Sequence, residues 1–335
     1  MSDADAPLTV EEVAPGITRI ALPLTGLPSG VNVHLLRGDG PTTLIDAAIP
    51  TEGSWRGLEA GLAAVGAAPT DVEQVVLTHH HVDHVGLAGR LGELGARIVA
   101  QPPVAEALAD PRGFHERELD WGERHVARHA APVEILGSPR AAVRMLDGFR
   151  PWSDVAEIVE GDVVPAGDLR LRVLARPGHS PTDTLLVDEE RGIAAVGDHL
   201  FATAPLTPVL GSMVDPRGRP AADYLRAIEE TAARGERLLL TGHGPALDDP
   251  AATIADRRAA LDRRTARIRA ALSPEPTTAW DLGLRVWPGG TPGLHGLTRL
   301  AAVLASLELL EDRGVVRRGD DPQRVTWSLA EAAGA

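Results

Sequence analysis

Short apolar segments that end in histidine or aspartate constrain the fold of this 335-residue chain more than any other feature. The first is the run VEQVVL followed by THHHVDHVG, residues 78–86, which holds four histidines and one aspartate. Later segments of the same kind are RVLARPGHS, IAAVGDH and RLLLTGHG. Sheet enzymes place their chemistry on loops at the ends of rigid strands, so we expect these segments to meet at one site.

The region before the histidine cluster predicts an α/β fold. Residues 17–24, 31–38 and 42–47 read as short strands separated by glycine or proline. Residues 51–66 have the apolar spacing of a helix, and residues 74–78 read as a buried strand that ends at the cluster.

A long stretch between the cluster and PGHS, residues 102–155, is helical in pattern and predicts an insertion over the site. Within it, the segment 124–150 has five arginines against only two acidic residues, Glu134 and Asp147; the arginines are Arg124, Arg128, Arg140, Arg144 and Arg150. These could hold one carboxylate or phosphate group of a substrate. The alternative is an ordinary solvated helix with i,i+4 ion pairs such as Asp120 with Arg124.

Residues 256–335 differ in character and predict a small, helical C-terminal domain. Helices are expected over 251–272, 277–287 and 296–314, followed by a hairpin made of VVRRG and RVTWSL. This order resembles a winged helix. The third helix is rich in leucine and acidic at its end, so we expect packing or homodimerisation rather than DNA binding. His295, just before it, is a candidate for reaching the pocket.

Composition excludes several classes of function. The formal net charge of −14 disfavours nucleic-acid binding, which draws on a basic surface. With no cysteine, the chain has no disulfide, thiolate metal site or cysteine nucleophile. No apolar run reaches membrane-spanning length. The start MSDADAPLTVEEV lacks the basic and apolar regions of a secretory signal, so we expect a cytoplasmic protein without membrane insertion.

The residue types at the strand ends fit a metal site. On a tight turn His79 and His81 can point the same way, while Asp83 and His84 can face a second position nearby. Later strand ends would complete the ligand shells with His179, Asp198 and His243. Seven ligands fit two metal ions and one bridging carboxylate. Imidazole and carboxylate suit zinc, and a catalytic zinc keeps one position open for water.

The ordered set THHHVDHVG, PGHS, GDH and GHG resembles the metallo-β-lactamase-fold, glyoxalase II-like hydrolases, with their H-x-H-x-D-H motif and three later ligands. The resemblance covers roughly residues 10–255. It implies a four-layer αββα sandwich, here spanning 1–255 as the catalytic domain. It also implies two metal sites: His79, His81 and His179 would bind the first metal, Asp83, His84 and His243 the second, and Asp198 would bridge them. LIDAAIP stands where relatives often have Asp-Thr-Gly, which affects a supporting loop rather than a ligand.

Other histidines are expected to be structural. His80 should point away from its neighbours, His199 should lie on the opposite side of its strand, and His34 should pack in the sheet. His125 and His129 are four residues apart and could chelate a metal from one helix face, but no third ligand is in view.

We therefore expect a binuclear metal hydrolase that acts on a small, anionic ester or thioester. Two divalent ions, zinc in preference to iron or manganese, would lower the pKa of a bridging water and polarise the substrate carbonyl, and Asp83 would orient that water. Histidine at position 81, where di-iron redox relatives carry a carboxylate, favours hydrolysis. The alternatives are a phosphodiesterase or ribonuclease of the same fold and a lactonase or β-lactamase-like hydrolase.

Overall fold

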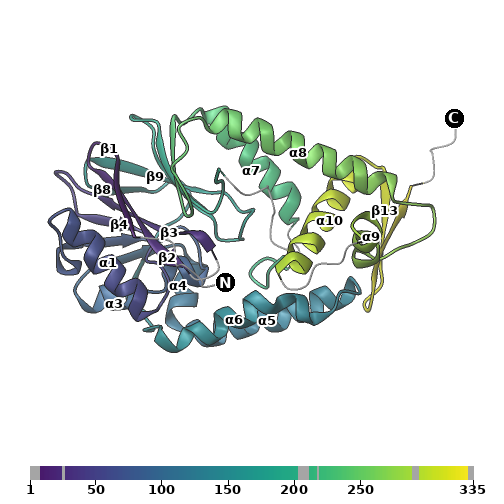
Figure 1. Ribbon diagram of the computed structural model, residues 1–335, viewed down its shortest axis with the longest axis horizontal. Helices are drawn as coiled ribbons and strands as arrows, with labels where there is room; N and C mark the ends of the chain where they lie inside the picture. The colour runs from purple at the N-terminus through teal and green to yellow at the C-terminus, as the bar shows by residue number, and fades with distance from the viewer. Residues whose placement is uncertain (1–7, 25–26, 203–210, 217–218, 289–293, 331–335) are drawn as a thin grey trace.

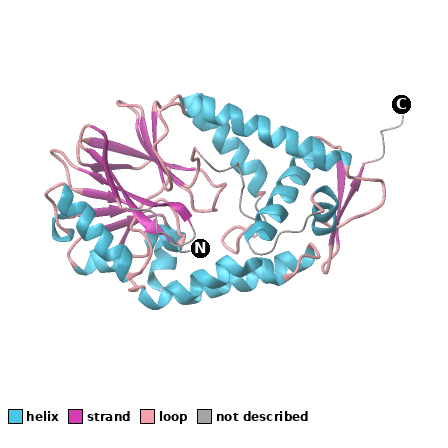
Figure 2. Ribbon diagram, viewed as in Figure 1, coloured by secondary structure: helices cyan, strands magenta, loops and turns pink. Residues whose placement is uncertain are grey.

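The computed structural model describes residues 8–24, 27–202, 211–216, 219–288 and 294–330. Two sheets pack face to face at one end of the molecule, and a smaller helical part forms the other end (Figures 1 and 2). Two long helices, α5 (Pro111–Arg128) and α8 (Pro250–Ala270), run along opposite sides and join these two parts.

The first sheet has seven strands in chain order. Its first four strands pair antiparallel, and its last four pair parallel, since the chain crosses over through helices between them. The strands are β1 (Thr9–Ala14), β2 (Ile17–Leu24), β3 (Leu27–Leu36), β4 (Thr43–Ile45), β5 (Gln74–Val76), β6 (Arg97–Ala100) and β7 (Val155–Glu157).

The second sheet has five strands in the order β12-β11-β10-β9-β8. Only β11 and β12 pair parallel; the other neighbours pair antiparallel. The strands are β8 (Val163–Ala166), β9 (Leu169–Ala175), β10 (Thr184–Asp188), β11 (Ile193–Gly197) and β12 (Leu238–Thr241).

Apolar clusters separate four layers. One cluster lies between the two sheets and joins residues such as Val76 of β5 to Leu186 of β10. A second packs the outer face of the first sheet against α1 (Glu52–Ala64), α3 (Ala88–Glu93) and α4 (Pro102–Ala109). A third packs the second sheet against α7 (Pro220–Arg234) and the start of α8. The αββα sandwich expected from the sequence is confirmed.

Helix α1 illustrates how the sequence specifies an outer layer. The Thr51 side chain accepts a hydrogen bond from the Ser54 backbone N–H and caps the helix. Trp55, Leu58 and Leu62, at helical spacing, are all buried against the sheet.

The insertion predicted over residues 102–155 is helical up to Gly148, through α4, α5, α6 (Gly137–Met145) and short 3-10 turns, and β7 begins at Val155. Its two ends pack differently. Val104 and Leu108 belong to the core of the first sheet, whereas Val126, Ile135 and Leu136 belong to the C-terminal cluster. The insertion therefore ties the two parts of the molecule together.

The C-terminal part contains the predicted helices and hairpin: α8, α9 (Ala279–Val286), α10 (Leu294–Asp312), β13 (Val316–Asp320) and β14 (Val325–Leu329). The proposed boundary between residues 255 and 256 falls inside α8, so this helix is shared by both parts. Leu300, Leu304 and Leu307 are buried within the chain's own cluster, so a homodimer would need another surface. None of the described helices is long and apolar enough to cross a membrane.

Candidate metal centre

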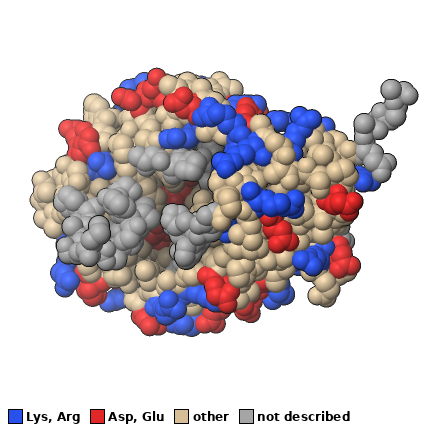
Figure 3. Space-filling view, turned by 45° about the vertical axis from the view of Figure 1, so that its right-hand side comes forward, with Lys and Arg blue, Asp and Glu red and all other residues tan. Residues whose placement is uncertain are grey.

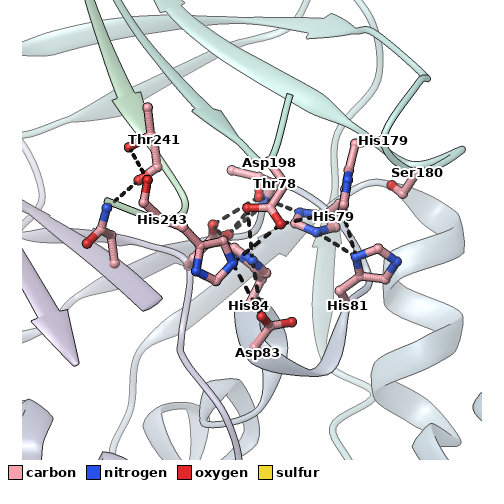
Figure 4. A network of polar contacts seen from close by, with 12 residues as sticks. Thr78, His79, His81, Asp83, His84, His179, Ser180, Asp198, Thr241 and His243 are labelled. Atoms are coloured by element: carbon pink, nitrogen blue, oxygen red, sulfur yellow. Dashed lines mark hydrogen bonds and ion pairs between the residues drawn. The ribbon is translucent and has the colours of Figure 1, made fainter. Parts of the chain in front are cut away.

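The histidine cluster occupies the turn between β5 and the short helix α2 (Val82–Val85). His79 follows the strand, His81 is the N-cap of α2 with an extended backbone, and Asp83 and His84 lie in the single turn of this helix. The parallel strand β5 and the second sheet meet at this edge, where β9, β11 and β12 lead into His179, Asp198 and His243 (Figure 4).

The first group of converging nitrogens comes from His79, His81 and His179. The Nδ1 atom of His81 lies 3.1 Å from His79 Nε2 and 3.0 Å from His179 Nε2. The ligand atoms of these three side chains all lie within 4.8 Å of one another. Three imidazoles that turn nitrogens toward one point form the kind of nitrogen set that zinc takes.

The second group comprises Asp83, His84 and His243. The Asp83 Oδ2 atom lies 3.4 Å from His243 Nε2 and 3.8 Å from His84 Nε2. These ligand atoms also lie within 4.8 Å of one another.

Asp198 lies between the two groups. Its Oδ1 is 3.3 Å from His84 Nε2, and its Oδ2 is 3.4 Å from both His179 Nε2 and His243 Nε2. Because one carboxylate faces nitrogens of both groups, it has the position that a bridging ligand requires. The seven side chains named from the sequence are thus brought together at one edge of the sandwich.

Hydrogen bonds on the outer side orient three of the imidazoles. The Nδ1–H of His84 donates to Asp46 Oδ2 at 2.8 Å, and that of His243 donates to the Gly30 carbonyl at 2.6 Å. The Thr78 hydroxyl donates to Asp46, so it accepts from His79 Nδ1 at 3.0 Å. Each ring then turns an Nε2 lone pair inward, which is the arrangement that orients metal-binding histidines.

Two buried polar atoms that lack a hydrogen-bond partner in the described part of the chain indicate that the site fits a cation. His84 Nε2 and Asp198 Oδ1 have no hydrogen-bond partner among the described residues, although both are inaccessible to solvent. Buried polar atoms are normally satisfied, and a metal ion would satisfy both. With five imidazoles and two carboxylates, the donor set fits divalent ions that take nitrogen and oxygen ligands.

The electrostatics of the site agree with cation binding. Burial, reinforced by the neighbouring His179, lowers the pKa of His81 to about 3, so this ring is neutral and able to ligate. At His243 burial also opposes charge, but the Asp198 and Asp83 carboxylates outweigh it and raise the pKa to about 10. In the absence of a metal these carboxylates would hold a proton on the ring, which an incoming cation would replace.

Asp46 is a functional residue that the sequence interpretation missed. Its carboxylate accepts from the Thr78 N–H, the Thr78 hydroxyl and His84 Nδ1. It follows β4 directly, so the strand-end rule that pointed to Asp198 would also have pointed to Asp46.

The remaining histidines lie outside these groups. His80 is buried with its Nδ1 2.9 Å from the Thr182 hydroxyl, and His199 Nε2 lies 2.9 Å from the Thr231 hydroxyl. His34 is buried on β3. Within the described part of the chain, no third candidate ligand joins His125 and His129. The side chain of His295 lies outside the described residues.

The family model described as Metallo-beta-lactamase superfamily matches residues 26–243. The chain belongs to this superfamily. It is 27% identical over 286 residues to a probable metallo-hydrolase, YqjP, of Bacillus subtilis, covering 84% of this chain and 86% of that protein. The acyl-coenzyme A thioesterase MBLAC2 of Gallus gallus is 32% identical over 188 residues, which cover 55% of this chain and 60% of that protein.

Solved structures share the whole architecture. The crystal structure of a metallo-beta-lactamase family protein from Thermus thermophilus matches with a TM-score of 0.75 and 28% identity, over 95% of this chain and 100% of that one. The match extends past the sandwich into the C-terminal part. This chain is therefore a metallo-hydrolase of the superfamily.

Proposed function

We propose that the chain hydrolyses small acyl thioesters with the help of two divalent metal ions. The observation that carries the proposal is the convergence of two ligand groups, each with three members, around the shared carboxylate of Asp198. His79, His81 and His179 would hold one ion, Asp83, His84 and His243 the other, and Asp198 would contact both. Zinc fits these ligands best, and iron and manganese also accept them.

Bound at these residues, the ions would supply water activation near neutral pH and polarisation of the substrate carbonyl. Asp83 is the ligand candidate with the most exposed side chain in the second group, at 24% against 8% for His243. Coulombic attraction to His84 and a hydrogen bond to His243 overcome its burial and hold its pKa below the usual range. An ionised Asp83 that is partly exposed to solvent can accept a hydrogen bond from the attacking water and orient it.

A thioester is favoured because its leaving group is stable without protonation, and the chain offers no cysteine for covalent catalysis. The relative named as an acyl-coenzyme A thioesterase supports the same choice. The small-molecule substrate, homodimerisation through the C-terminal part and a cytoplasmic location remain predictions.

The alternative is a phosphodiesterase or ribonuclease, which the same ligands could serve and which the winged-helix-like hairpin favours. The net charge of −14 opposes it. On the face shown in Figure 3, basic side chains gather over the C-terminal part, while acidic and basic side chains intermix along the lower edge. A lactonase or β-lactamase-like hydrolase remains a second alternative.

Metal-loaded enzyme should be screened against acyl thioesters, lactones, β-lactams and single-stranded RNA. We expect the highest kcat/KM for a thioester, with activity abolished by a chelator and restored by the metal. An Asp198→Asn variant should be inactive on every substrate. Its inactivity would exclude a contaminating esterase as the source of the activity. RNA cleavage that falls with salt, without acyl hydrolysis, would overturn the proposal.

A further inference from the structure

A second cavity lies at the far end of α5, between this helix, α10 and the β13–β14 hairpin. Its volume of about 520 Å³ is in the range of small-molecule sites. None of the seven candidate metal ligands lines it.

One face of α5 supplies much of the wall. Its residues are Trp121, Arg124, His125 and Arg128 of the helix and His129 at its C-cap. Residues three and four positions apart in this set lie on one face of the helix. The rings of Trp121 and His125 are stacked, with centroids 4.6 Å apart and an interplanar angle of 15°. The wall therefore carries flat aromatic surface and guanidinium groups side by side.

The wall formed by the β13–β14 hairpin also combines an arginine with an aromatic ring. Arg318 of β13 lies over the Trp327 ring of β14, with its guanidinium carbon 5.7 Å from the ring centroid. Both residues line the cavity. Arginine with tryptophan suits a ligand that has both phosphate groups and a planar ring.

The charge balance of the lining is positive. Three arginines face two carboxylates, Asp215 and Glu308. Burial raises the pKa of Glu308 to about 7, so this carboxyl carries only part of its charge at neutral pH. Arg124 forms no ion pair with Asp120, the partner expected from the sequence, among the described residues. In contrast, Arg117 on the same helix pairs with Glu106 at 2.8 Å.

Two buried polar atoms in the lining lack a partner. His129 Nδ1 and Trp327 Nε1 have no hydrogen bond to any described residue, although the two residues are only 3% and 2% exposed. Burial, with the nearby charges of His125, Arg318 and Arg128, lowers the pKa of His129 to about 3. A neutral imidazole and an indole N–H that are left unsatisfied point to a polar ligand in this cavity.

A smaller pocket beside the cavity is lined by Gly178 and Ser180, which flank the candidate ligand His179. That pocket and the larger cavity share Gly211, Asp215 and Pro220 in their walls. A long ligand could thus reach from one to the other.

We propose that this cavity binds the phosphate-bearing nucleotide end of a thioester carrier, while the acyl end lies at the metal centre. The arginines would bind phosphate oxygens, the tryptophans would contact the planar base, and His129 would hydrogen-bond to it. The inference rests on the proposed thioester hydrolysis for the acyl end only; nucleotide binding itself can be measured without turnover.

Binding should be tested calorimetrically on the metal-loaded enzyme with adenosine 3′,5′-bisphosphate, adenosine and inorganic phosphate. We expect the bisphosphate to bind at least tenfold more tightly than either fragment, since it engages both kinds of group. Arg124→Gln and Arg318→Gln should each weaken it by about ten- to a hundredfold, the worth of a hydrogen bond to a charged group. Arg117→Gln, on α5 but outside the cavity, should bind it like the parent enzyme.

Equal binding by the parent and both cavity variants would overturn the inference, as would bisphosphate binding no tighter than phosphate alone. A kinetic comparison separates this failure from failure of the proposed function. The parent enzyme should hydrolyse an acyl-coenzyme A with a higher kcat/KM than the matching acyl-pantetheine. Arg124→Gln should remove that preference, and Arg117→Gln should keep it. If both thioesters react equally well, the hydrolase proposal stands and the nucleotide site is refuted. If neither reacts but the bisphosphate binds through Arg124, the cavity is upheld and the thioesterase proposal fails.

Discussion

Asp46 organises the metal centre although it is none of the seven candidate ligands. It holds Thr78 and His84 together, and its backbone adopts a left-handed conformation with φ of 65°. Ala48, two residues later, also has a positive φ, 48°, where a glycine would be relaxed. Strained residues that are held by their surroundings cluster at functional sites, and here they place a carboxylate behind His84.

Asp83 and His80, which lie on the same turn after β5, offer a test of individual roles. Asp83→Asn removes the charge that faces His243, so turnover should fall by roughly a hundredfold or more and the second metal should bind more weakly. His80→Asn keeps a polar atom for the Thr182 hydroxyl and should change neither metal content nor turnover. Metal content by mass spectrometry and kcat with the best thioester are the measurements. Equal losses in both variants would refute the assignment.

At the scale of single residues, the sequence predicted which side chains lie on the loops at the ends of strands. Each of the seven candidate ligands lies within eight residues of the end of a strand, so their convergence could be predicted from local pattern. Thr182 and the Gly30 carbonyl could not be predicted, because their contacts with His80 and His243 join residues 102 and 213 positions apart. Such pairings depend on how the two sheets are placed against each other.

Helix α5 connects the sandwich to the C-terminal part and packs against both. Near its start, Phe114 packs 5.3 Å from the His80 ring; near its end, Val126 lies in the C-terminal cluster. In between, Glu118 accepts hydrogen bonds from the Ser212 hydroxyl and the Met213 N–H and so holds the segment after β11. The sequence predicted a helical insertion, but not this packing, because residues 126 and 307 are brought together only by the tertiary fold.

The contact between α10 and α7 should make stability depend on pH through Glu308. Its side chain accepts from the Ala221 N–H, and burial raises its pKa from 4.5 to about 7. The folded state therefore binds the proton more tightly than the unfolded state, and the free energy of unfolding should fall as pH rises from about 5 to 8. Glu308→Gln should remove up to about 3 kcal/mol of that decline.

Denaturant unfolding of the parent and Glu308→Gln at pH 5 and pH 8 measures this effect. Glu311→Gln, one turn along α10, is the control for loss of a charge near Arg219. A decline of the same size in the parent and Glu308→Gln would show that this carboxyl is ionised in the folded protein.

At the scale of the whole molecule, the metal centre joins the two sheets. His79, His81, Asp83 and His84 come from the first sheet, and His179, Asp198 and His243 come from the second. The apolar cluster packs the two sheets against each other. At the metal centre, the groups that face each other across the sheets are instead two carboxylates and five imidazoles. Without cations, the two buried carboxylates are balanced by protons on neighbouring imidazoles such as His243, which an incoming metal would displace, so metal binding and folding should be coupled.

We therefore expect about two divalent ions per fully loaded chain, and a large effect of their removal on stability as well as on activity. Ions that bind only the folded chain stabilise it in proportion to the logarithm of their concentration over Kd, so chelation should lower the unfolding midpoint by about 5 °C or more. Readdition of zinc should restore the midpoint in two steps if the two groups differ in affinity. In Asp83→Asn the weaker step should disappear, while the step that depends on His79, His81 and His179 persists. A single equivalent that restores both stability and activity would contradict the two-ion assignment, because Asp198 would then have no second ion to bridge.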